Sequence, residues 1–348
     1  MTERPSTALE VIDFQAAECG RAGSPLYARI LTGVAEDLRA GGPTADLLGG
    51  RDGDPFGSAL ALRLLGAVHR IVLEGRAPVL GALYPSVGGD PMAGDPAAEF
   101  LATLQAHRDE VEHRLTDGVQ TNEVGRAAVL AGGYATVSAH TGLPLRVLEV
   151  GTSAGLNLRF DHFAYDTGLH VSGAPGSPVR FTGVWEGPAP ALPPRFDVAE
   201  RRGCDRNPID ATTDEGRLTL LSFMWPDQLP RIARLEAAIT VARSVPVELE
   251  RADAAAWVES QLAEPHVGVA TVVVHSIVFQ YLSSDRRRRI RAALESAGRA
   301  ATPDAPICWL RMEPAGDRAE LRLNLWPDGD REVLATAGYH GHPIWWHG

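Results

Sequence analysis

The sequence contains little cysteine and no closely spaced cysteine pair. Its three cysteines, Cys19, Cys204 and Cys308, are scattered over 348 residues, which argues against a disulfide framework. An odd, dispersed set is typical of a reducing compartment, so we expect a cytoplasmic protein. The sequence also shows no N-terminal signal segment and no apolar run long enough to cross a membrane, so we expect no membrane partner.

Positive charge is also scarce. The chain has 33 Lys and Arg residues against 44 Asp and Glu residues, a formal net charge of -11. Because binding to nucleic acid phosphates needs a basic surface, we expect no nucleic-acid partner. The one basic run, Arg286–Arg289, falls in a predicted helix and is interpreted as a solvated face. The eleven histidines show no metal-binding spacing such as H-E-x-x-H, so no metal site is predicted.

The most informative stretch is 145–158, with the sequence LRVLEVGTSAGLNL. Leu145–Val150 is an apolar run of strand length, Gly151 and Gly155 bracket a tight turn, and the pattern then becomes helical. A strand, a glycine turn and a helix form the first unit of a doubly wound sheet, where ligands bind in the crevice. A dinucleotide fingerprint needs a second glycine where Ser153 stands, so a pyrophosphate is disfavoured.

The chain before this stretch shows helical patterns and no strand alternation. Helices are predicted over Ala8–Glu18 and Leu26–Leu38, and Ser58 is expected to cap another. Asp95 followed by Pro96 is typical of a helix start. We therefore predict an N-terminal helical cap domain over 1–144 and a second domain over 145–348.

Asn122 and Glu123 stand in a polar segment just before an apolar helix predicted over Ala127–Val137. They can cap that helix, with the acidic side chain favourably placed in its first turn. Alternatively they face a cofactor or substrate, because this helix leads directly into the motif strand. The sequence leaves both interpretations open.

Two acidic residues follow later predicted strands. Residues 168–194 are rich in Gly and Pro and include a strand-like segment, Val179–Trp185, so we expect an inserted flap at about 168–195 near the substrate. Asp205 ends the second strand of the series, where nucleotide folds bind ribose hydroxyls. Asp253 follows the third, predicted over Val245–Glu250, and its alternative role is a helix N-cap.

The fourth predicted strand, Ala270–Val274, ends at His275, which we interpret as a candidate general base. A fifth strand, Pro306–Met312, ends at Glu313, and an antiparallel hairpin of Glu320–Trp326 and Glu332–Ala337 follows. In the tail, Tyr339 and His340 can line a substrate pocket. The favoured alternative is that the tail covers the edge of the sheet.

Four segments together carry a resemblance to a known family: LEVGTSAGLNL, RRGCDRNP, VVVHSIVFQYL and GYHGHP. Over nearly the whole chain the sequence resembles the bacterial domain of unknown function 2332. The E-x-G-x-x-x-G motif and the acid-terminated strands resemble the class I S-adenosylmethionine (SAM) methyltransferases. The resemblance implies an α/β fold, a Rossmann-like methyltransferase sheet that is mostly parallel with an antiparallel C-terminal hairpin. The Asp/Asn-Pro-Pro-Tyr signature is absent where His275-Ser-Ile-Val stands, which argues against N-methylation of amides or adenine.

The resemblance also implies roles for individual residues. SAM is the expected cofactor, with Glu149 at its methionine amino group, Asp205 at the ribose and Asp253 at the adenine. The full set of expected cofactor residues is Glu149, Gly151, Ser153, Gly155, Asn157, Asp205, Asn207, Asp253 and Ala254. The expected proton acceptors are His275, Glu123 and Glu313, and the expected substrate residues are Asn122, Tyr339 and His340.

The predicted activity is methyl transfer to a small molecule. One alternative keeps the fold but catalyses an elimination or an intramolecular cyclisation, since fold does not determine chemistry. Another is a non-catalytic nucleotide-fold subunit. The sequence leaves homo- or hetero-oligomerisation open.

Overall fold

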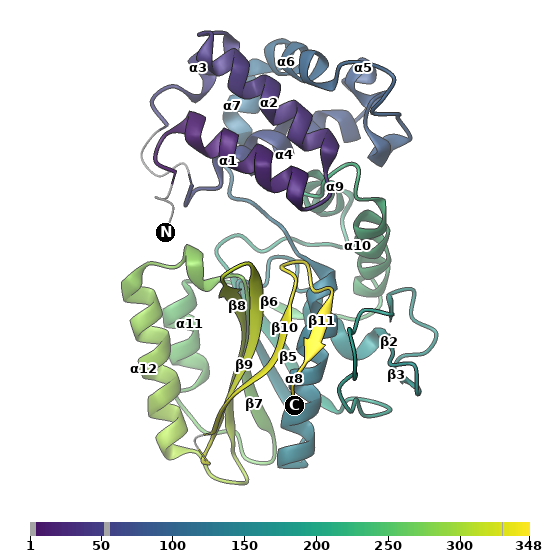
Figure 1. The fold of residues 1–348 in the computed structure, drawn as a ribbon. Helices are drawn as coiled ribbons and strands as arrows, with labels where there is room; N and C mark the ends of the chain where they lie inside the picture. The colour runs from purple at the N-terminus through teal and green to yellow at the C-terminus, as the bar shows by residue number, and fades with distance from the viewer. Residues whose placement is uncertain (1–4, 52–55, 329) are drawn as a thin grey trace. The chain divides into compact units, whose positions relative to one another are not determined.

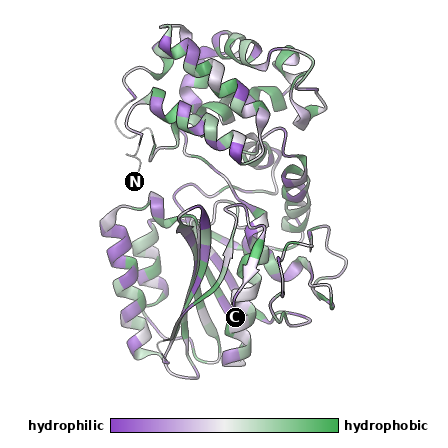
Figure 2. Cartoon of the chain, in the orientation of Figure 1, coloured by the Kyte–Doolittle hydropathy of each residue, from purple (hydrophilic) through white to green (hydrophobic). Residues whose placement is uncertain are grey.

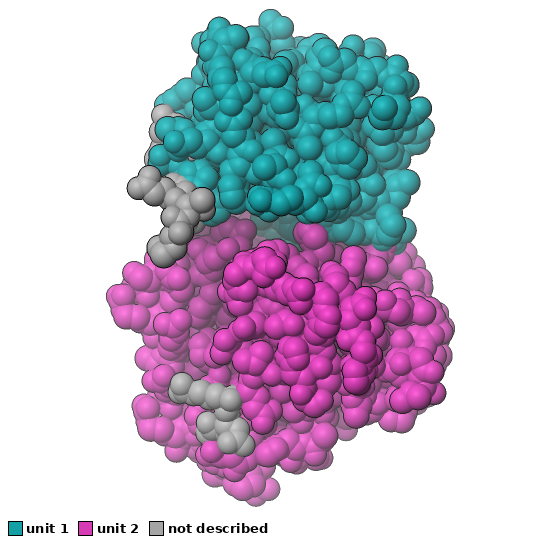
Figure 3. All heavy atoms as spheres, in the orientation of Figure 1, with its two compact units in different colours: residues 1–121, 213–233 teal, residues 122–212, 234–348 magenta. Residues whose placement is uncertain are grey.

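The computed structural model describes residues 5–51, 56–328 and 330–348, and the chain forms two compact units (Figure 3). Unit 1 comprises Met1–Thr121 and Thr213–Ala233, and unit 2 comprises Asn122–Thr212 and Arg234–Gly348. The predicted boundary at residue 144 therefore lies too late in the chain. In addition, the internal segment 213–233, which the prediction places in the second domain, belongs to the helical unit.

Unit 1 consists of helices throughout its described residues (Figure 1). Its elements are α1 (Ala8–Arg21), α2 (Pro25–Arg39), α3 (Pro43–Leu48), α4 (Leu60–Leu73), α5 (Pro78–Gly81), η1 (Pro85–Val87), α6 (Pro96–Ala106), α7 (Arg108–Arg114), α9 (Asp214–Ser222) and the start of α10 (Leu229–Ala242). Its core contains fully buried side chains such as Ile12, Ile30, Leu64 and Phe100. Burial of such side chains supplies the main stabilisation of a helical unit.

The helix starts in unit 1 follow local capping chemistry, with one exception. Thr7 and Glu10 form a capping box on α1, and Asp95 accepts hydrogen bonds from the first backbone N–H groups of α6. The prediction that Ser58 caps α4 is wrong. The N-cap residue is Ala59, which has a positive φ of 53° and no side-chain acceptor, while Ser58 accepts a hydrogen bond from Arg63.

Unit 2 is built on an eight-stranded sheet with the order β11-β10-β9-β8-β7-β1-β5-β6. Its strands are β1 (Leu145–Val150), β5 (Val198–Asp205), β6 (Glu248–Arg251), β7 (Ala270–Ser276), β8 (Ile307–Ala315), β9 (Arg318–Trp326), β10 (Asp330–Ala337) and β11 (Ile344–Trp346). The strands from β6 to β8 pair in parallel, and the pairs from β8 to β11 are antiparallel. The predicted mostly parallel α/β sheet with antiparallel C-terminal strands is confirmed.

The order of the parallel strands creates a switch point beside β1. The chain runs outward from β1 to β5 and β6, and it then returns to β7 on the other side of β1. Crossovers in opposite directions leave a crevice at the carboxyl ends of the two central strands, where ligands of such sheets bind. In this sheet that place is the end of β1 and β7, at Val150 and Ser276.

Helices cover both faces of the sheet (Figure 1). The pair α11 (Ala254–Gln261) and α12 (Ser284–Ala300) packs on one face, and α12 is largely hydrophilic along its length (Figure 2). On the other face lies α8 (Ala127–Thr141), whose Gly133 fits against Leu310 so closely that a Cβ there would come within 2.5 Å of it. This packing explains why α8 belongs to unit 2 rather than to the predicted N-terminal domain.

The segment after the motif turn differs from the prediction. It forms a 3-10 helix, η3 (Asn157–His162), and not an α-helix. A small sheet with the order β3-β2-β4 follows, built from Ala164–Asp166 (β2), Val171–Gly173 (β3) and Arg180–Thr182 (β4). This sheet is the inserted element that the Gly- and Pro-rich segment predicts.

Candidate functional site

The turn after β1 has an unusual backbone. Gly151, Ser153 and Gly155 all have positive φ values, of 69°, 52° and 63°. Glycine adopts such angles without strain, but serine does so at a cost. A Cβ on Gly151 would also come within 2.7 Å of Val278, so the turn is fitted tightly against the segment after β7.

Asp205, at the end of β5, lies against this turn. Its Oδ2 accepts a hydrogen bond from the backbone N–H of Ser153 at 2.9 Å, and its Oδ1 accepts one from Asn207 at 2.9 Å. The side-chain oxygen of Asn207 in turn accepts a hydrogen bond from Arg251. An ionised carboxylate has about four acceptor sites, so these two bonds leave room for ligand hydroxyls. The structure thus brings together the predicted cofactor residues of β1 and β5.

The polar segment at 122–126 also reaches the turn. Asn122 Oδ1 accepts a hydrogen bond from Leu156 N at 2.9 Å, and Asn157 Nδ2 donates to the carbonyl of Glu123 at 3.2 Å. The side chain of Asn157 is only 2% exposed, and its Oδ1 has no hydrogen-bond partner among the described residues. A buried amide oxygen left in this state is costly unless a ligand or water satisfies it.

The geometry supports the capping interpretation of Glu123. Glu123 caps the short 3-10 helix η2 (Val124–Arg126), because its Oε1 accepts from Gly125 N at 3.1 Å. Its other oxygen lies 3.3 Å from Nδ1 of His340, which belongs to the C-terminal loop. Glu123 is 2% exposed, so the pair places a carboxylate and an imidazole together in a largely buried position.

Glu149 is the buried carboxylate of the motif. It is 4% exposed, and its Oε2 accepts a hydrogen bond of 2.6 Å from Thr152 Oγ1. Burial and, to a lesser extent, the nearby Asp205 raise the pKa of Glu149, whereas Thr152, Arg126 and Arg159 lower it, and the net result is a pKa of about 7. The group therefore changes charge near neutral pH.

Two arginines that sequence reasoning missed hold the site together. Arg126 donates to the carbonyls of Tyr339 and Ser276, both at 3.0 Å, and so ties the C-terminal loop to the end of β7. Arg159, which is 4% exposed, donates to the carbonyls of Gly155 and Val245, both at 2.8 Å. Burial lowers the pKa of Arg159 to about 10. Their only sequence signal is a basic residue placed within an apolar pattern.

A second strained residue lies across the switch point. Ile277, which follows β7, has a φ of 57°, and such an angle is rare for a β-branched residue. Ser153 and Ile277 thus distort the backbone at the ends of β1 and β7, the two strands that border the crevice. Backbone strain of this kind concentrates at ligand sites, where the surrounding structure holds it in place.

His275 lies elsewhere. Leu148, Val150 and Val273 belong to the apolar cluster under α11 and α12. Because side chains alternate along a strand, His275 points to that face and Glu149 to the opposite one. His275 is 0% exposed, with Nδ1 2.6 Å from Glu313 and Nε2 3.0 Å from Trp309 Nε1.

This arrangement removes the reason for regarding His275 as a base. An indole N–H can only donate, so Nε2 of His275 is the acceptor and Nδ1 carries the proton toward Glu313. No lone pair of the imidazole remains free to accept another proton. Glu313 also accepts from Val278 N and Phe279 N. Burial acts to raise the pKa of Glu313, but these bonds and His275 outweigh it and lower the pKa.

The remaining predicted residues take structural positions. Asp253 caps α11 through Ala255 N and Ala256 N and pairs with Arg286, which lowers the pKa of Asp253, so the N-cap alternative describes its contacts. Ala254 is the first residue of α11. Tyr339 donates its hydroxyl to Gly316 O at 2.6 Å, and the tail beyond it adds β11 to the sheet edge, as the favoured alternative predicted.

The described residues contain no cluster of His, Cys, Asp and Glu that could hold a metal ion. In the same part of the chain, no helix has the length and apolar character needed to cross a bilayer. The available donors and acceptors are carboxylates, amides, arginines and the backbone of the turn. These groups suit a polar organic ligand.

Comparison with known proteins identifies one family. The sequence profile described as "Uncharacterized protein conserved in bacteria (DUF2332)" matches residues 10–346. Searches of curated proteins and of solved structures gave no significant match.

Proposed function

The chain belongs to this bacterial family, and from its own site residues we propose that unit 2 binds SAM and transfers the methyl group to a small molecule. The observation that carries the proposal is the contact between Asp205 and Ser153 N, 2.9 Å apart. It places the acid that ends β5 on the turn that ends β1. In the class I methyltransferases, which the sequence resembles, these two positions serve the ribose and the methionine end of SAM.

The strand order supports this choice of fold family. The parallel strands β6-β5-β1-β7-β8 place β1 at the centre, with a switch point beside it and an antiparallel continuation after β8. The side chains around the turn also suit the cofactor. Glu149 offers a carboxylate for an ammonium group, Asp205 offers acceptors for hydroxyls, and Asn157 Oδ1 is a buried acceptor without a partner among the described residues.

SAM supplies an activated methyl group on a sulfonium, which an acceptor atom displaces in line. For such a reaction, positioning of the two reactants supplies most of the rate. Ser153, Gly151 and Gly155 fix the turn, while Asn122 holds its helical side through Leu156 N. A catalytic base is needed only when the substrate atom that receives the methyl group must lose a proton. We propose the Glu123–His340 pair for that role, in place of His275.

A calorimetric titration of the purified protein with SAM and S-adenosylhomocysteine tests the proposal. The variant Asp205→Asn removes the negative charge and one of the two acceptor oxygens but keeps the other oxygen. A matched control is Asp166→Asn, because Asp166 also accepts a backbone N–H two residues later, from Gly168 at 3.1 Å. We expect micromolar binding that Asp205→Asn weakens roughly tenfold or more and Asp166→Asn leaves unchanged.

The opposite results are equally informative. If neither compound binds the wild-type protein, the methyl donor is not SAM and the proposed function fails. If SAM binds and is consumed without S-adenosylhomocysteine forming, the site carries out another reaction, the elimination or cyclisation that the fold also permits.

A further inference from the structure

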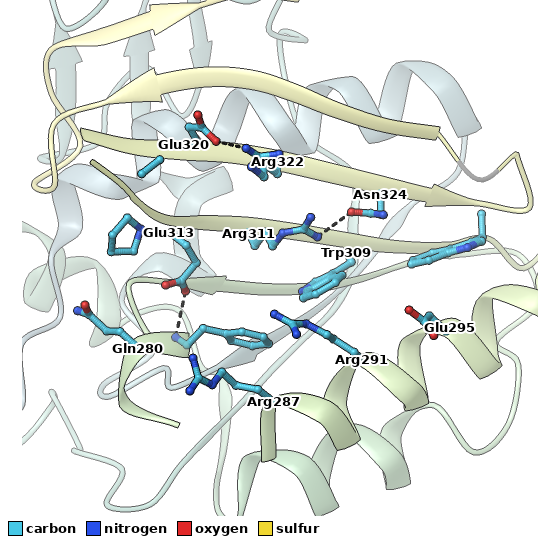
Figure 4. Close-up of a pocket in the computed structure, with 14 residues that line it drawn as sticks. Gln280, Arg287, Arg291, Glu295, Trp309, Arg311, Glu313, Glu320, Arg322 and Asn324 are labelled. Atoms are coloured by element: carbon cyan, nitrogen blue, oxygen red, sulfur yellow. Dashed lines mark hydrogen bonds and ion pairs between the residues drawn. The ribbon is translucent and has the colours of Figure 1, made fainter. Parts of the chain in front are cut away.

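A cavity of about 550 Å³ lies on the α12 face of unit 2 (Figure 4). Its walls come from η4 (Phe279–Tyr281), from α12 and from β8 and β9. Its volume falls in the range of small-molecule sites. The lining side chains that carry charge are Arg287, Arg291, Arg311, Arg322, Glu295, Glu313 and Glu320.

Most of the negative charge in this cavity is already engaged. Glu320 pairs with Arg322, and Glu313 binds His275 and two backbone N–H groups. Arg287 and Arg291 make no ion pair with a described residue, and Arg311 stacks on Trp309 in the aromatic floor. The cavity lining carries four arginines and three glutamates, so its formal charge is positive although the chain as a whole is acidic.

The basic run on α12 supplies one of these charges. Arg286 pairs with Asp253, Arg288 with Asp285 and Arg289 with Glu259. Arg287 makes no ion pair within the described part of the chain, and it lines the cavity instead. The interpretation of the whole run as a solvated face is therefore incomplete.

Arg291 continues the same stripe one helical turn later. Residues 287, 291 and 295 are spaced by four, so they lie on one face of α12. Arg291 forms no ion pair with any described residue, and its guanidinium lies 5.9 Å from the ring centroid of Phe279. Figure 4 shows Arg287 and Arg291 between α12 and β8, the strand that carries Trp309 and Arg311.

The floor of the cavity is aromatic and ordered. Trp309 and Phe279 are each 8% exposed, with ring centroids 5.8 Å apart. Arg311 stacks on Trp309 at 4.0 Å and donates to Asn324 Oδ1 at 2.7 Å, which fixes its guanidinium. His275 stacks on Phe279 at 4.1 Å and supports the floor from beneath. A ligand here meets arginine donors beside aromatic carbon.

We propose that this cavity is a second ligand site, which binds a small organic anion with an apolar body through Arg287 and Arg291. A guanidinium matches the two oxygens of a carboxylate or a phosphate, and two of them one turn apart double that match. The aromatic floor selects an anion that carries a ring or a comparable apolar group. This inference does not depend on the proposed methyl transfer, because the cavity and the β1 turn share no lining residue.

Ligand-observed NMR and calorimetry with simple probes test the site. Benzoate and phenyl phosphate carry the two anionic groups on a ring, benzamide is the neutral counterpart, and acetate lacks the apolar body. We expect both aromatic anions to bind, in competition with each other, and benzamide and acetate to bind far more weakly. The stronger of the two anions identifies the natural headgroup as carboxylate or phosphate.

The variants assign binding to the cavity. Arg287→Gln with Arg291→Gln should weaken the aromatic anions roughly tenfold or more, and the exposed neighbour change Arg288→Gln should leave them unaffected. Binding of SAM at the other site should be the same in all three proteins. The proposal is overturned if no anion binds, if benzamide binds as well as benzoate, or if the double variant binds as the wild type does.

Discussion

The indole N–H of Trp309 donates to Nε2 of the fully buried His275 across 3.0 Å, between the sheet and α12. The same imidazole lies 2.6 Å from Glu313 through Nδ1. This relationship fixes the tautomer of His275 and uses both of its ring nitrogens. His275, which the sequence suggests as a base, therefore has a structural role beneath the aromatic floor of the cavity next to α12.

Trp309→Phe tests the structural role of this contact. Phe keeps one aromatic ring to stack on Arg311 but is smaller than Trp, and Nε2 of the fully buried His275 loses its donor. An unsatisfied buried acceptor costs about 1–3 kcal/mol, so we expect the free energy of unfolding to fall by that amount in urea titrations. Trp326→Phe is the control, since the Trp326 indole makes no hydrogen bond within the described residues. Equal losses in the two variants would contradict the assignment.

Glu149 should make stability depend on pH. Its pKa is raised from 4.5 in the unfolded chain to about 7 in the folded protein, so folding favours the protonated form. The stabilisation is complete below about pH 4.5, declines as pH rises, and is lost once pH passes about 7. Glu149→Gln imitates the protonated form at every pH. We expect the free energy of unfolding of Glu149→Gln, relative to that of the wild type, to increase by roughly 2 kcal/mol from about pH 5.5 to about pH 8.5.

Thr152→Val provides the second arm of this experiment. The hydroxyl of Thr152 lowers the pKa of Glu149, so its removal should move the wild-type pH dependence to higher pH. Urea titrations over the same pH series measure both effects. A constant difference between Glu149→Gln and the wild type across that series would show that Glu149 does not titrate there.

The fit of Gly151 can be separated from its backbone angle. Gly151 and Gly142 have nearly the same φ, 69° and 65°, but a Cβ on Gly151 would meet Val278 at 2.7 Å and one on Gly142 would meet nothing within 4 Å. Gly142→Ala should therefore lower the free energy of unfolding only through the strain of a positive φ, by about 1–2 kcal/mol. Gly151→Ala should cost clearly more.

Val278→Ala provides the check by a double-mutant cycle in urea. It removes the two methyl groups that the new Cβ would meet, so in its presence Gly151→Ala should cost no more than Gly142→Ala. If the cost of Gly151→Ala does not change, the turn is not held by this contact.

The sequence predicted the parallel strands and the acids at their ends because those signals are local. The six residues of β1 are apolar apart from Arg146 and Glu149, and all six are buried. The strand β5 was harder to predict from the sequence, because residues 198–203 have a low propensity for strands. Its arginines are held by acids of neighbouring segments, Arg201 by Asp161 and Arg202 by Glu250, and these partners lie 40 and 48 residues away in sequence.

The errors come from contacts that no local pattern records. In the 3-10 helix after the motif turn, the carbonyl of Gly155 accepts from Leu158 N three residues later, and the side chain of Arg159 takes the place of the fourth-residue N–H of an α-helix. The helix α8 is apolar on all sides, so its sequence fits a helical bundle as well as a sheet. The partners of His275 lie 34 and 38 residues further along the chain.

Glu149 also connects the proposed cofactor to pH. If its carboxylate meets the ammonium group of SAM, binding requires the ionised form, and a pKa of about 7 makes that form scarce in acid. An α-amino group stays protonated below about pH 7.7, so the ligand keeps its charge in this range. We expect calorimetric affinity for SAM to rise roughly tenfold between about pH 5.5 and about pH 7.

The variant Glu149→Gln tests whether this carboxylate causes the rise. It should bind SAM more weakly than the wild type at about pH 7, and its affinity should not rise between about pH 5.5 and about pH 7. A rise of the same size in Glu149→Gln would instead assign the titration to another group, with the Glu123–His340 pair as the next to test by His340→Gln.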